Sequence, residues 1–363
     1  MLFFSIRIEK CLIMAITQKQ IAQHLGLSQP LVAQALGGHP GVAERTRARV
    51  IEAASELGYD IHSNTAARSL VSRRHGQRVK THQIAVLMGD PFDGTVLQDM
   101  PFFREILQGI HSEAEKRDLD VAIHILRPGN IPRAVLSGDI DGALCVYSRT
   151  INQDLAAQGV SIPVVRLDAY QTDRWAIYAD NEGGMEKVTR HLIELGHEKI
   201  AFIGGLLDPT SSSHPRRFDG FKKALEEADL TLNPELMPTE IVQPSETAGY
   251  KAMLRLLEKT RDFTAVVCGA DAIAVGAMKA AREAGLRIPE DVSITGFDGI
   301  TLSGYGSNDS LTTVFYDRRV MGRRAVEMLE EIASNPTAPP RHEILPVRLW
   351  ARDSTAAPAL TSV

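Results

Sequence analysis

Four aspartates stand at the ends of apolar, strand-like segments, where their carboxylates could bind a ligand. They are Asp90, Asp168, Asp271 and Asp298. In open α/β sheets ligands bind beyond the carboxyl ends of the strands, and carboxylates there can accept hydrogen bonds from a polyhydroxylated molecule. Arg217, near a later helix, could donate two more hydrogen bonds. A single aspartate at such a position is as readily a helix cap or a turn residue, but four together favour a pocket.

A second set of residues, near the chain start, could read DNA. Gln29, Pro30, Ala33 and Gln34 would lie on the outer face of a short helix, free to enter a major groove. Glutamine can pair with the major-groove edge of adenine through two hydrogen bonds, so Gln29 and Gln34 are predicted to read bases. A small helical subdomain without a nucleic-acid role is the alternative, but it leaves the basic charge of this region unexplained.

The segment NTAARSLVSRR, residues 64–74, suits a DNA-bending hinge. Asn64 can cap a short helix, and Leu70 stands among basic residues that include Arg68. An apolar wedge surrounded by cations suits insertion between base steps in a minor groove. A plain basic linker is the alternative for these residues.

The DNA-facing residues require a helical unit, which residues 16–62 predict. Thr17 and Gln20 form a capping box for a first helix that ends at Gly26. Ser28 caps a second helix, and a third is predicted from about residue 43 to 57. Two short helices joined by a tight glycine turn make a helix-turn-helix.

Charge is divided unevenly along the chain. Residues 16–80 contain nine Lys and Arg, the first of them Lys19, against four acidic residues. Residues 81–363 carry a net charge of −11, within −5 for the whole chain. A basic segment on an acidic body indicates a polyanionic partner for the segment.

Composition excludes several classes of protein. With 363 residues, 44% hydrophobic and 23% charged, the chain is typical of a soluble globular protein with two or three cores. Cys11, Cys145 and Cys268 form neither a disulfide framework nor a zinc-ligand spacing, so we expect a cytoplasmic location, no metal and no cofactor. The sequence contains neither a membrane-spanning run nor a convincing signal-peptide cleavage site. Phosphate-binding loops, nucleophile elbows and zinc-protease motifs are absent from it, so we expect no enzyme activity.

Strand-like and helical segments alternate from about residue 81. The expected strands are 84–88, 121–126, 142–147, 164–168, 200–205, 263–270 and 292–298. The expected helices lie near 101–117, 181–197 and 317–334, and another begins at Asp271. This alternation predicts an α/β fold with parallel sheets covered by helices, and its length predicts two subdomains.

Together these segments resemble the lactose-repressor and galactose-repressor (LacI/GalR) family of bacterial transcription regulators. The motifs that carry the resemblance, in family order from residue 16 to about 330, are QIAQHLGLSQPLVAQAL, VAERTRARVIEAASELGY, NTAARSL, DNEGGMEKVTRHLIELGHEKIAFIGG, RRFDGF, ADAIAVGAMKAAREAGLRIPEDVSITGFD and LTTV. The resemblance implies a homodimeric repressor that reads a near-palindromic operator and kinks it with paired hinge helices. It also implies an effector, most commonly a sugar, held between two subdomains of a periplasmic-binding-protein-like core. A solute-binding protein of a transport system is the alternative with the same body fold.

The chain departs from the family pattern at several functional positions. Leu31-Val32-Ala33-Gln34 replaces the usual Thr-Val-Ser-Arg of the recognition helix, and the DIHS stretch before Asn64 is two residues longer and lacks a proline. Ala270 and Gly299 replace two polar residues beside the predicted ligand site. Operator sequence and effector identity therefore cannot be transferred from the family.

The expected domains follow from these motifs. Residues 1–15 are a leader, within which Met14 is the expected start codon. Residues 16–62 bind DNA, and residues 63–80 form the hinge helix and linker. Residues 81–354 bind the effector and 355–363 are a tail, with subdomains of about 81–180 plus 312–341 and 181–311 plus 342–354.

The expected contact residues fall into two sets. The DNA-binding set is Thr17, Lys19, Ser28, Gln29, Pro30, Gln34, Asn64, Arg68 and Leu70. The effector-binding set is Asp90, Asp168, Arg217, Asp271 and Asp298. Arg217 stands where the family grips its ligand, and Arg216 beside it is the alternative.

Overall fold

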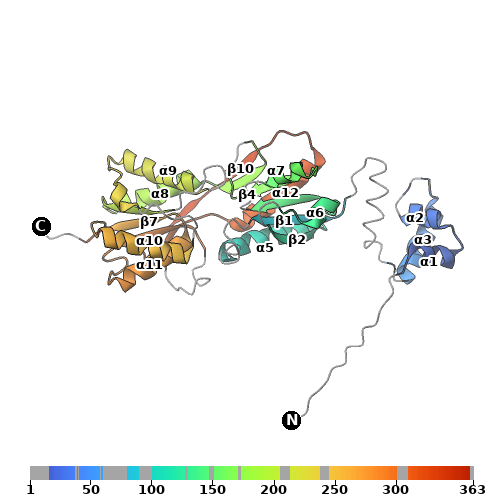
Figure 1. Cartoon of the computed structure of the whole chain (residues 1–363), viewed down its shortest axis with the longest axis horizontal. Helices are drawn as coiled ribbons and strands as arrows, with labels where there is room; N and C mark the ends of the chain where they lie inside the picture. Colours follow the sequence, from blue (N-terminus) through green and yellow to red (C-terminus); the bar gives the residue numbers. More distant parts are fainter. Residues whose placement is uncertain are drawn as a thin grey trace, which may run out of the picture. The chain divides into compact units, whose positions relative to one another are not determined.

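The computed structural model divides the chain into two compact units, with the boundary between Thr81 and His82 (Figure 1). The structure describes residues 16–36, 39, 41–57, 59, 80–89, 100–126, 130–146, 151–170, 173–204, 213–237, 245–300 and 310–359. The predictions for the leader, for the hinge residues Asn64, Arg68 and Leu70, and for Asp90 lie outside these residues.

The described part of the first unit contains three helices, as predicted. They are α1 (Gln18–Leu25), α2 (Gln29–Leu36) and α3 (Glu44–Glu56). The capping box is present, because the Thr17 hydroxyl accepts from the Gln20 N–H and the Gln20 side chain accepts from the Thr17 N–H. Gly26 has φ 65°, a left-handed conformation that glycine adopts without strain and that ends α1.

A small apolar core holds these helices together. Ile21 of α1, Val32 of α2 and Val50 of α3 are each 0% exposed. Because each helix contributes a buried stripe to the same cluster, the opposite faces of the helices remain available for contacts.

The described residues of the second unit form two sheets. The first has the strand order β10-β5-β4-β3-β1-β2, and its described pairs are all parallel. Its strands are β1 (Gln83–Gly89), β2 (Asp120–Leu126), β3 (Gly142–Val146), β4 (Val164–Leu167), β5 (Ala176–Ala179) and β10 (His342–Leu345).

Helices cover both faces of this first sheet. Its helices are α5 (Met100–Lys116), α6 (Arg133–Ser137), α7 (Ile151–Ala157) and α12 (Arg318–Ser334). On β1, Ile84 and Val86 join a core with α5 and α12, whereas Ala85 and Leu87 join a second core with α6 and α7. This alternation follows from the two-residue repeat of a strand that is buried on both sides.

The second sheet has the order β11-β9-β8-β7-β6, with β11 antiparallel to β9. Its strands are β6 (Ile200–Ile203), β7 (Ala265–Cys268), β8 (Ser293–Asp298), β9 (Thr312–Phe315) and β11 (Arg348–Trp350). The associated helices are α8 (Asn181–Glu194), α9 (His214–Glu227), the 3-10 turn η2 (Pro234–Leu236), α10 (Glu246–Lys259) and α11 (Asp271–Glu283). Figure 1 shows α8 and α9 on one face of this sheet and α10 and α11 on the other.

All seven strands predicted between residues 84 and 298 are present. The sequence did not indicate β5, β10 or β11, which have three or four residues each, nor that residues 312–315 form a strand. Strands β10 (HEIL) and β11 (RLW) each begin with an exposed polar residue, so they lack the apolar run that marks the similarly short β6 (IAFI) and β7 (AVVC).

The chain passes between the two sheets three times, and this corrects the expected subdomains. The passages lie between β5 and α8, between β9 and α12, and between β10 and β11. Residues 312–315, expected within the first subdomain, form β9 and pair with β8 of the second sheet. Residues 342–345, expected within the second subdomain, form β10 and pair with β5 of the first sheet. These two assignments were wrong because main-chain pairing, which sequence patterns do not report, decides which sheet a short strand joins.

Helices α8 and α9 pack so closely at Gly220 that only glycine fits. A Cβ there would lie 2.1 Å from the carbonyl oxygen of Glu182. We expect Gly220→Ala to push the helices apart and to lower the free energy of unfolding by about 1–3 kcal/mol. Urea denaturation measures this loss. Glu226→Ala, on the exposed face of α9, is the matched control and should be near neutral. An unchanged Gly220→Ala variant would contradict the tight packing.

Candidate functional site

Three of the predicted effector residues converge in the second unit. Asp168 directly follows β4 of the first sheet, Arg217 lies in α9, and Asp298 is the last residue of β8. Nη2 of Arg217 donates to Oδ1 of Asp298 at 3.0 Å. Asp168 lies close enough for the charges of the other two to change its pKa. We call these three residues the Arg217 cluster; it combines groups from both halves of the unit.

The Arg217 side chain is only 2% exposed, and its guanidinium group contacts several protein groups. Its Nε donates to Oδ1 of Asn181 at 2.7 Å, and Nη1 donates to the carbonyl oxygen of Gly269 at 2.7 Å. Its guanidinium carbon lies 3.8 Å from the ring centroid of Phe297. These contacts fix the orientation of the guanidinium group, as a charge-assisted, bidentate ligand contact requires.

Both carboxylates of the cluster sit on left-handed backbone. Asp168 has φ 52° and Asp298 has φ 116°. Aspartate visits the left-handed helical region more readily than most residues, but φ 116° is strained for any residue with a Cβ. The chain therefore turns sharply at both strand ends.

Burial changes the proton affinities of the cluster. Burial raises the pKa of Asp168 to about 6, and Arg217 opposes this rise. Burial likewise raises the pKa of Asp298, again against Arg217. Burial alone would lower the pKa of Arg217, but Asp298 and Asp168 outweigh it and raise that pKa. The arginine stays charged, while Asp168 can take up a proton in mildly acidic solution.

Asp271 lies beside the cluster, and both of its carboxylate oxygens have protein partners. It is the first residue of α11 and 0% exposed. Oδ2 accepts from the Ile300 N–H at 2.8 Å, and Oδ1 accepts from the Thr313 hydroxyl at 2.6 Å. Burial and, to a lesser extent, the charge of Asp298 together raise the pKa of Asp271 to about 8, against the hydrogen bonds from Thr313 and Ile300. These bonds hold the turn that follows Asp298.

Three residues that the sequence did not single out complete the surroundings. Arg318, 1% exposed, donates to the carbonyl oxygens of Asp298 and Gly299 and to Glu105 of α5. The Ser213 hydroxyl donates to the backbone carbonyl of Asp168 at 3.2 Å and lies 3.3 Å from its Oδ1. Asn181 supplies the acceptor for Nε of Arg217. No single-sequence pattern distinguishes a buried arginine such as Arg318 from its exposed neighbours.

Arg216 is directed away from the Arg217 cluster. It pairs with Glu182 at 3.0 Å and its guanidinium lies over the ring of Tyr170 at 3.8 Å. The structure thus separates the two adjacent arginines, and Arg217 is the one that meets the carboxylates.

The outer face of α2 in the first unit is available for contacts. Ser28, Gln29, Pro30, Ala33 and Gln34 are all exposed, whereas Val32 on the other face is fully buried. The Ser28 hydroxyl accepts from the Leu31 N–H at 3.4 Å, as predicted for a cap.

The other predicted DNA contacts in the described part of the unit precede α2. Thr17 and Lys19 are exposed at the start of α1. Hydroxyl and ammonium groups in this position are typical of contacts to phosphate.

Membrane-spanning helices and metal-binding clusters are the two further features to consider. Within the described ranges, no helix combines the length and apolar character needed to span a membrane. Nor do the same residues bring together three or more His, Cys, Asp or Glu side chains that could hold a metal ion.

Removal of the buried cation should be far more costly than removal of an exposed one. Arg217→Ala leaves the Asp298 carboxylate buried without its partner, so we expect a loss of about 3–5 kcal/mol in the free energy of unfolding. The control is Lys199→Ala, which breaks the exposed 2.6 Å pair with Asp262 and should cost less than about 1 kcal/mol. Urea titration followed by circular dichroism compares the two; equal losses would contradict the buried pair.

Comparison with known proteins places the chain in a family. The family model described as a periplasmic binding protein-like domain matches residues 189–355. The HTH-type transcriptional regulator AglR of Rhizobium meliloti (strain 1021) is 32% identical over 352 residues, covering 94% of this chain and 95% of AglR. The HTH-type transcriptional repressor PurR of Aliivibrio salmonicida (strain LFI1238) is 33% identical, covering 87% of this chain and 91% of PurR.

A solved structure agrees with these relatives. A lac repressor dimer bound to operator and the anti-inducer ONPF has a TM-score of 0.74 and 26% identity, covering 94% of this chain and 100% of that one. AglR covers 94% of this chain, which leaves too few residues outside the match to omit the helical unit, and AglR and PurR are both transcriptional regulators. This excludes the transport alternative. The chain belongs to the LacI family of ligand-responsive, DNA-binding transcriptional regulators.

Proposed function

We propose that this protein represses transcription from a near-palindromic operator, and that a small polyhydroxylated effector, a sugar, binds at the Arg217 cluster. The observation that carries this proposal is the convergence of Asp168 from the first sheet with Arg217 and Asp298 from the second. A ligand that contacts all three bridges the two halves of the unit.

The chemistry of the cluster suits sugar hydroxyl groups. Each hydroxyl can donate to a carboxylate oxygen of Asp168 or Asp298 and accept from an N–H of Arg217. Asp271 and Arg318 act as positioning residues, because their bonds hold the backbone around Asp298. Asp90 belongs to the proposed contact set on sequence grounds alone.

Control of DNA binding follows from the bridging position. A ligand that binds one relative arrangement of the two sheets more tightly than another shifts the equilibrium between them. Since the operator-bound dimer favours one arrangement, effector and operator change each other's affinity by the same factor.

The proposed function requires no enzyme activity of this protein. The named relatives are transcriptional regulators, and the charged groups of the Arg217 cluster pair with one another. Binding and release of a ligand are sufficient for such a role.

DNA recognition is assigned to the first unit and the segment after it. We propose that residues 16–62 bind DNA, that 63–80 form the hinge, and that the effector-binding domain begins at 81. The proposed contacts are Thr17, Lys19, Ser28, Gln29, Pro30, Gln34, Asn64, Arg68 and Leu70.

The effector assignment is tested with Asp298→Asn, which keeps the shape of the side chain and removes its charge. A thermal-shift screen of sugars and nucleosides first identifies a ligand for the wild type. We expect Asp298→Asn to weaken its binding about tenfold or more, since a hydrogen bond to a charged group contributes about 1.5–3 kcal/mol.

Calorimetry measures effector affinity, and operator titration with and without effector measures the coupling. The variant should still bind operator with near wild-type affinity but respond less to the effector. Asp262→Asn, at the exposed pair with Lys199, is the control and should behave as wild type. Unchanged effector affinity in Asp298→Asn would remove the cluster from the site.

Base reading is tested at Gln34, which is exposed on α2. A bidentate glutamine–adenine contact discriminates against wrong bases by about 1–3 kcal/mol, so Gln34→Ala should relax preference at one symmetric pair of operator positions. Selection from random duplexes measures the preference for wild type, Gln34→Ala and the control Ser55→Ala on exposed α3. Identical selected motifs for wild type and Gln34→Ala would contradict this role.

We infer that the dimer forms through the edge of the first sheet at which β2 lies. Strand β2 is the edge strand, and Ile123 and Ile125 on one face of it are 53% and 45% exposed. Light scattering should give two 39.7-kDa chains for the wild type and one for Ile123→Asp. Leu136→Asp, at another exposed apolar residue, should remain a dimer. A four-chain mass, or a dimeric Ile123→Asp, would contradict the assignment.

A further inference from the structure

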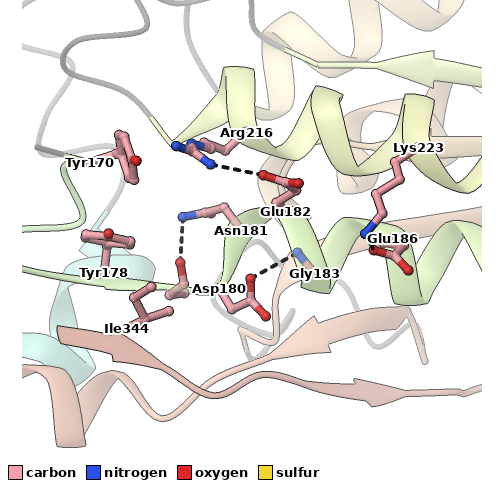
Figure 2. A pocket seen from close by; sticks show the side chains of 11 residues that line it. Tyr170, Tyr178, Asp180, Asn181, Glu182, Gly183, Glu186, Arg216, Lys223 and Ile344 are labelled. Carbon is pink, nitrogen blue, oxygen red and sulfur yellow. Dashed lines mark hydrogen bonds and ion pairs between the residues drawn. The ribbon is translucent and has the colours of Figure 1, made fainter. Parts of the chain in front are cut away.

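A pocket of about 280 Å³ lies on the second unit beside two of the three passages between the sheets (Figure 2). Residues 179–181 of the first passage line it, and so does Ile344, next to the strand end of the third. The Asp180 N–H donates to the carbonyl oxygen of Leu345 at 3.0 Å, so the two passages are bonded together at this point. Asp168, Arg217 and Asp298 are not among the described residues that line the pocket.

Both halves of the unit contribute walls to the pocket. Tyr178 of β5 and Tyr170, just after β4, come from the first half, with their rings 5.3 Å apart and inclined at 66°. Glu182 of α8 and Arg216 and Lys223 of α9 come from the second half. A molecule that contacts both sets of residues therefore senses the relative position of the two sheets.

One wall contains a buried hydroxyl group without a partner. Tyr178 is only 4% exposed, and its hydroxyl has no hydrogen-bond partner among the described residues. Figure 2 shows this hydroxyl on the side of the ring that faces Asn181. A buried hydroxyl without a partner is unfavourable, and a hydrogen bond to a ligand oxygen would remove this cost.

The charges around the pocket already have partners. Arg216 pairs with Glu182 at 3.0 Å, Lys223 pairs with Glu186 at 2.9 Å, and Asp180 accepts from the Gly183 N–H at 3.0 Å. A charged ligand would have to break these pairs, whereas a neutral one need not. Polar side chains whose charges are already paired, beside an unbonded hydroxyl, suit a neutral molecule with several hydroxyl groups.

We propose that this pocket is a second ligand site, distinct from the Arg217 cluster, for a neutral polyhydroxylated molecule of monosaccharide size. The ligand bonds to the Tyr178 hydroxyl and lies between the tyrosines and the polar residues of α8 and α9.

Asn181 lines the pocket and also contacts Arg217 of the Arg217 cluster. Its amide nitrogen donates to the carbonyl oxygen of Ala179 at 2.9 Å, and its Oδ1 accepts from Nε of Arg217 at 2.7 Å. A ligand in the pocket thus lies one side chain away from the residue proposed to hold the effector. Occupation of either site changes the affinity of the other by a common factor.

The test uses the full chain carrying Asp298→Asn, in which the proposed effector site is impaired. D-glucose, D-galactose and D-ribose are titrated into it by isothermal titration calorimetry. We expect at least one to bind, and addition of Tyr178→Phe to weaken that binding about two- to tenfold, as for one neutral hydrogen bond. Tyr250→Phe, whose surface hydroxyl bonds to Glu283, is the matched control and should leave the affinity unchanged.

Three results would overturn the site. They are failure of all three sugars to bind the Asp298→Asn chain, an unchanged affinity after Tyr178→Phe, and a fall in melting temperature in Tyr178→Phe, which would show that the hydroxyl serves the fold. Tighter binding of glucose 6-phosphate or glucosamine than of glucose would overturn the neutral class.

The coupling between the pocket at Tyr178 and the effector rests on the proposed function. The existence of this pocket as a ligand site does not. If the effector assignment is wrong, Asp298→Asn leaves effector affinity unchanged in the wild-type comparison, while the Tyr178→Phe result still stands. If only the pocket is wrong, the Asp298→Asn effect on the effector persists and the Tyr178→Phe effect is missing.

Discussion

The buried charge of Arg217 is the constraint on which the rest of the second unit depends. A guanidinium group with 2% of its side chain exposed is stable only if its N–H groups and its charge are satisfied by the protein. Its partners come from the start of α8, the residue after β7 and the end of β8. The ends of several elements must therefore meet at one point, and the tight contact of α8 with α9 at Gly220 brings two of them there.

The same network joins the two sheets. Arg318, at the start of α12, reaches the end of β8 in the second sheet and Glu105 on α5 beside the first. Asp168 comes from the first sheet and faces groups of the second. A change in the relative position of the two sheets must therefore rearrange these charged contacts. A small ligand that binds among them can thus shift the equilibrium between two arrangements of the whole unit.

Sequence reasoning was most successful where local chemistry decides the structure. The Thr17 capping box, the glycine at the end of α1 and the strands that end at Asp168 and Asp298 depend on residues near one another in the chain. The rule that ligands bind beyond the carboxyl ends of parallel strands also selects Asp168 and Asp298 in the sequence. Their meeting at Arg217 could not be read from that rule, because the two aspartates end strands of different sheets.

What could not be predicted depends on long-range pairing and burial. Strands 312–315 and 342–345 join the sheets opposite to those expected, because their register with β8 and β5 is a property of distant residues. Asp271 looked like Asp298 in the sequence, yet its oxygens bond to Thr313 and Ile300. Nothing local distinguished these environments.

The three passages between the sheets also set an order for folding during synthesis. The first sheet gains its strand β10 and its covering helix α12 only after nearly all of the second sheet has been made. Until residue 345 leaves the ribosome, neither half can complete its core, and long-range pairing of this kind is slow to form. The three-helix unit, by contrast, has its buried core in place by residue 59. A nascent chain thus completes the unit proposed to contact DNA long before it completes the unit proposed to bind the effector.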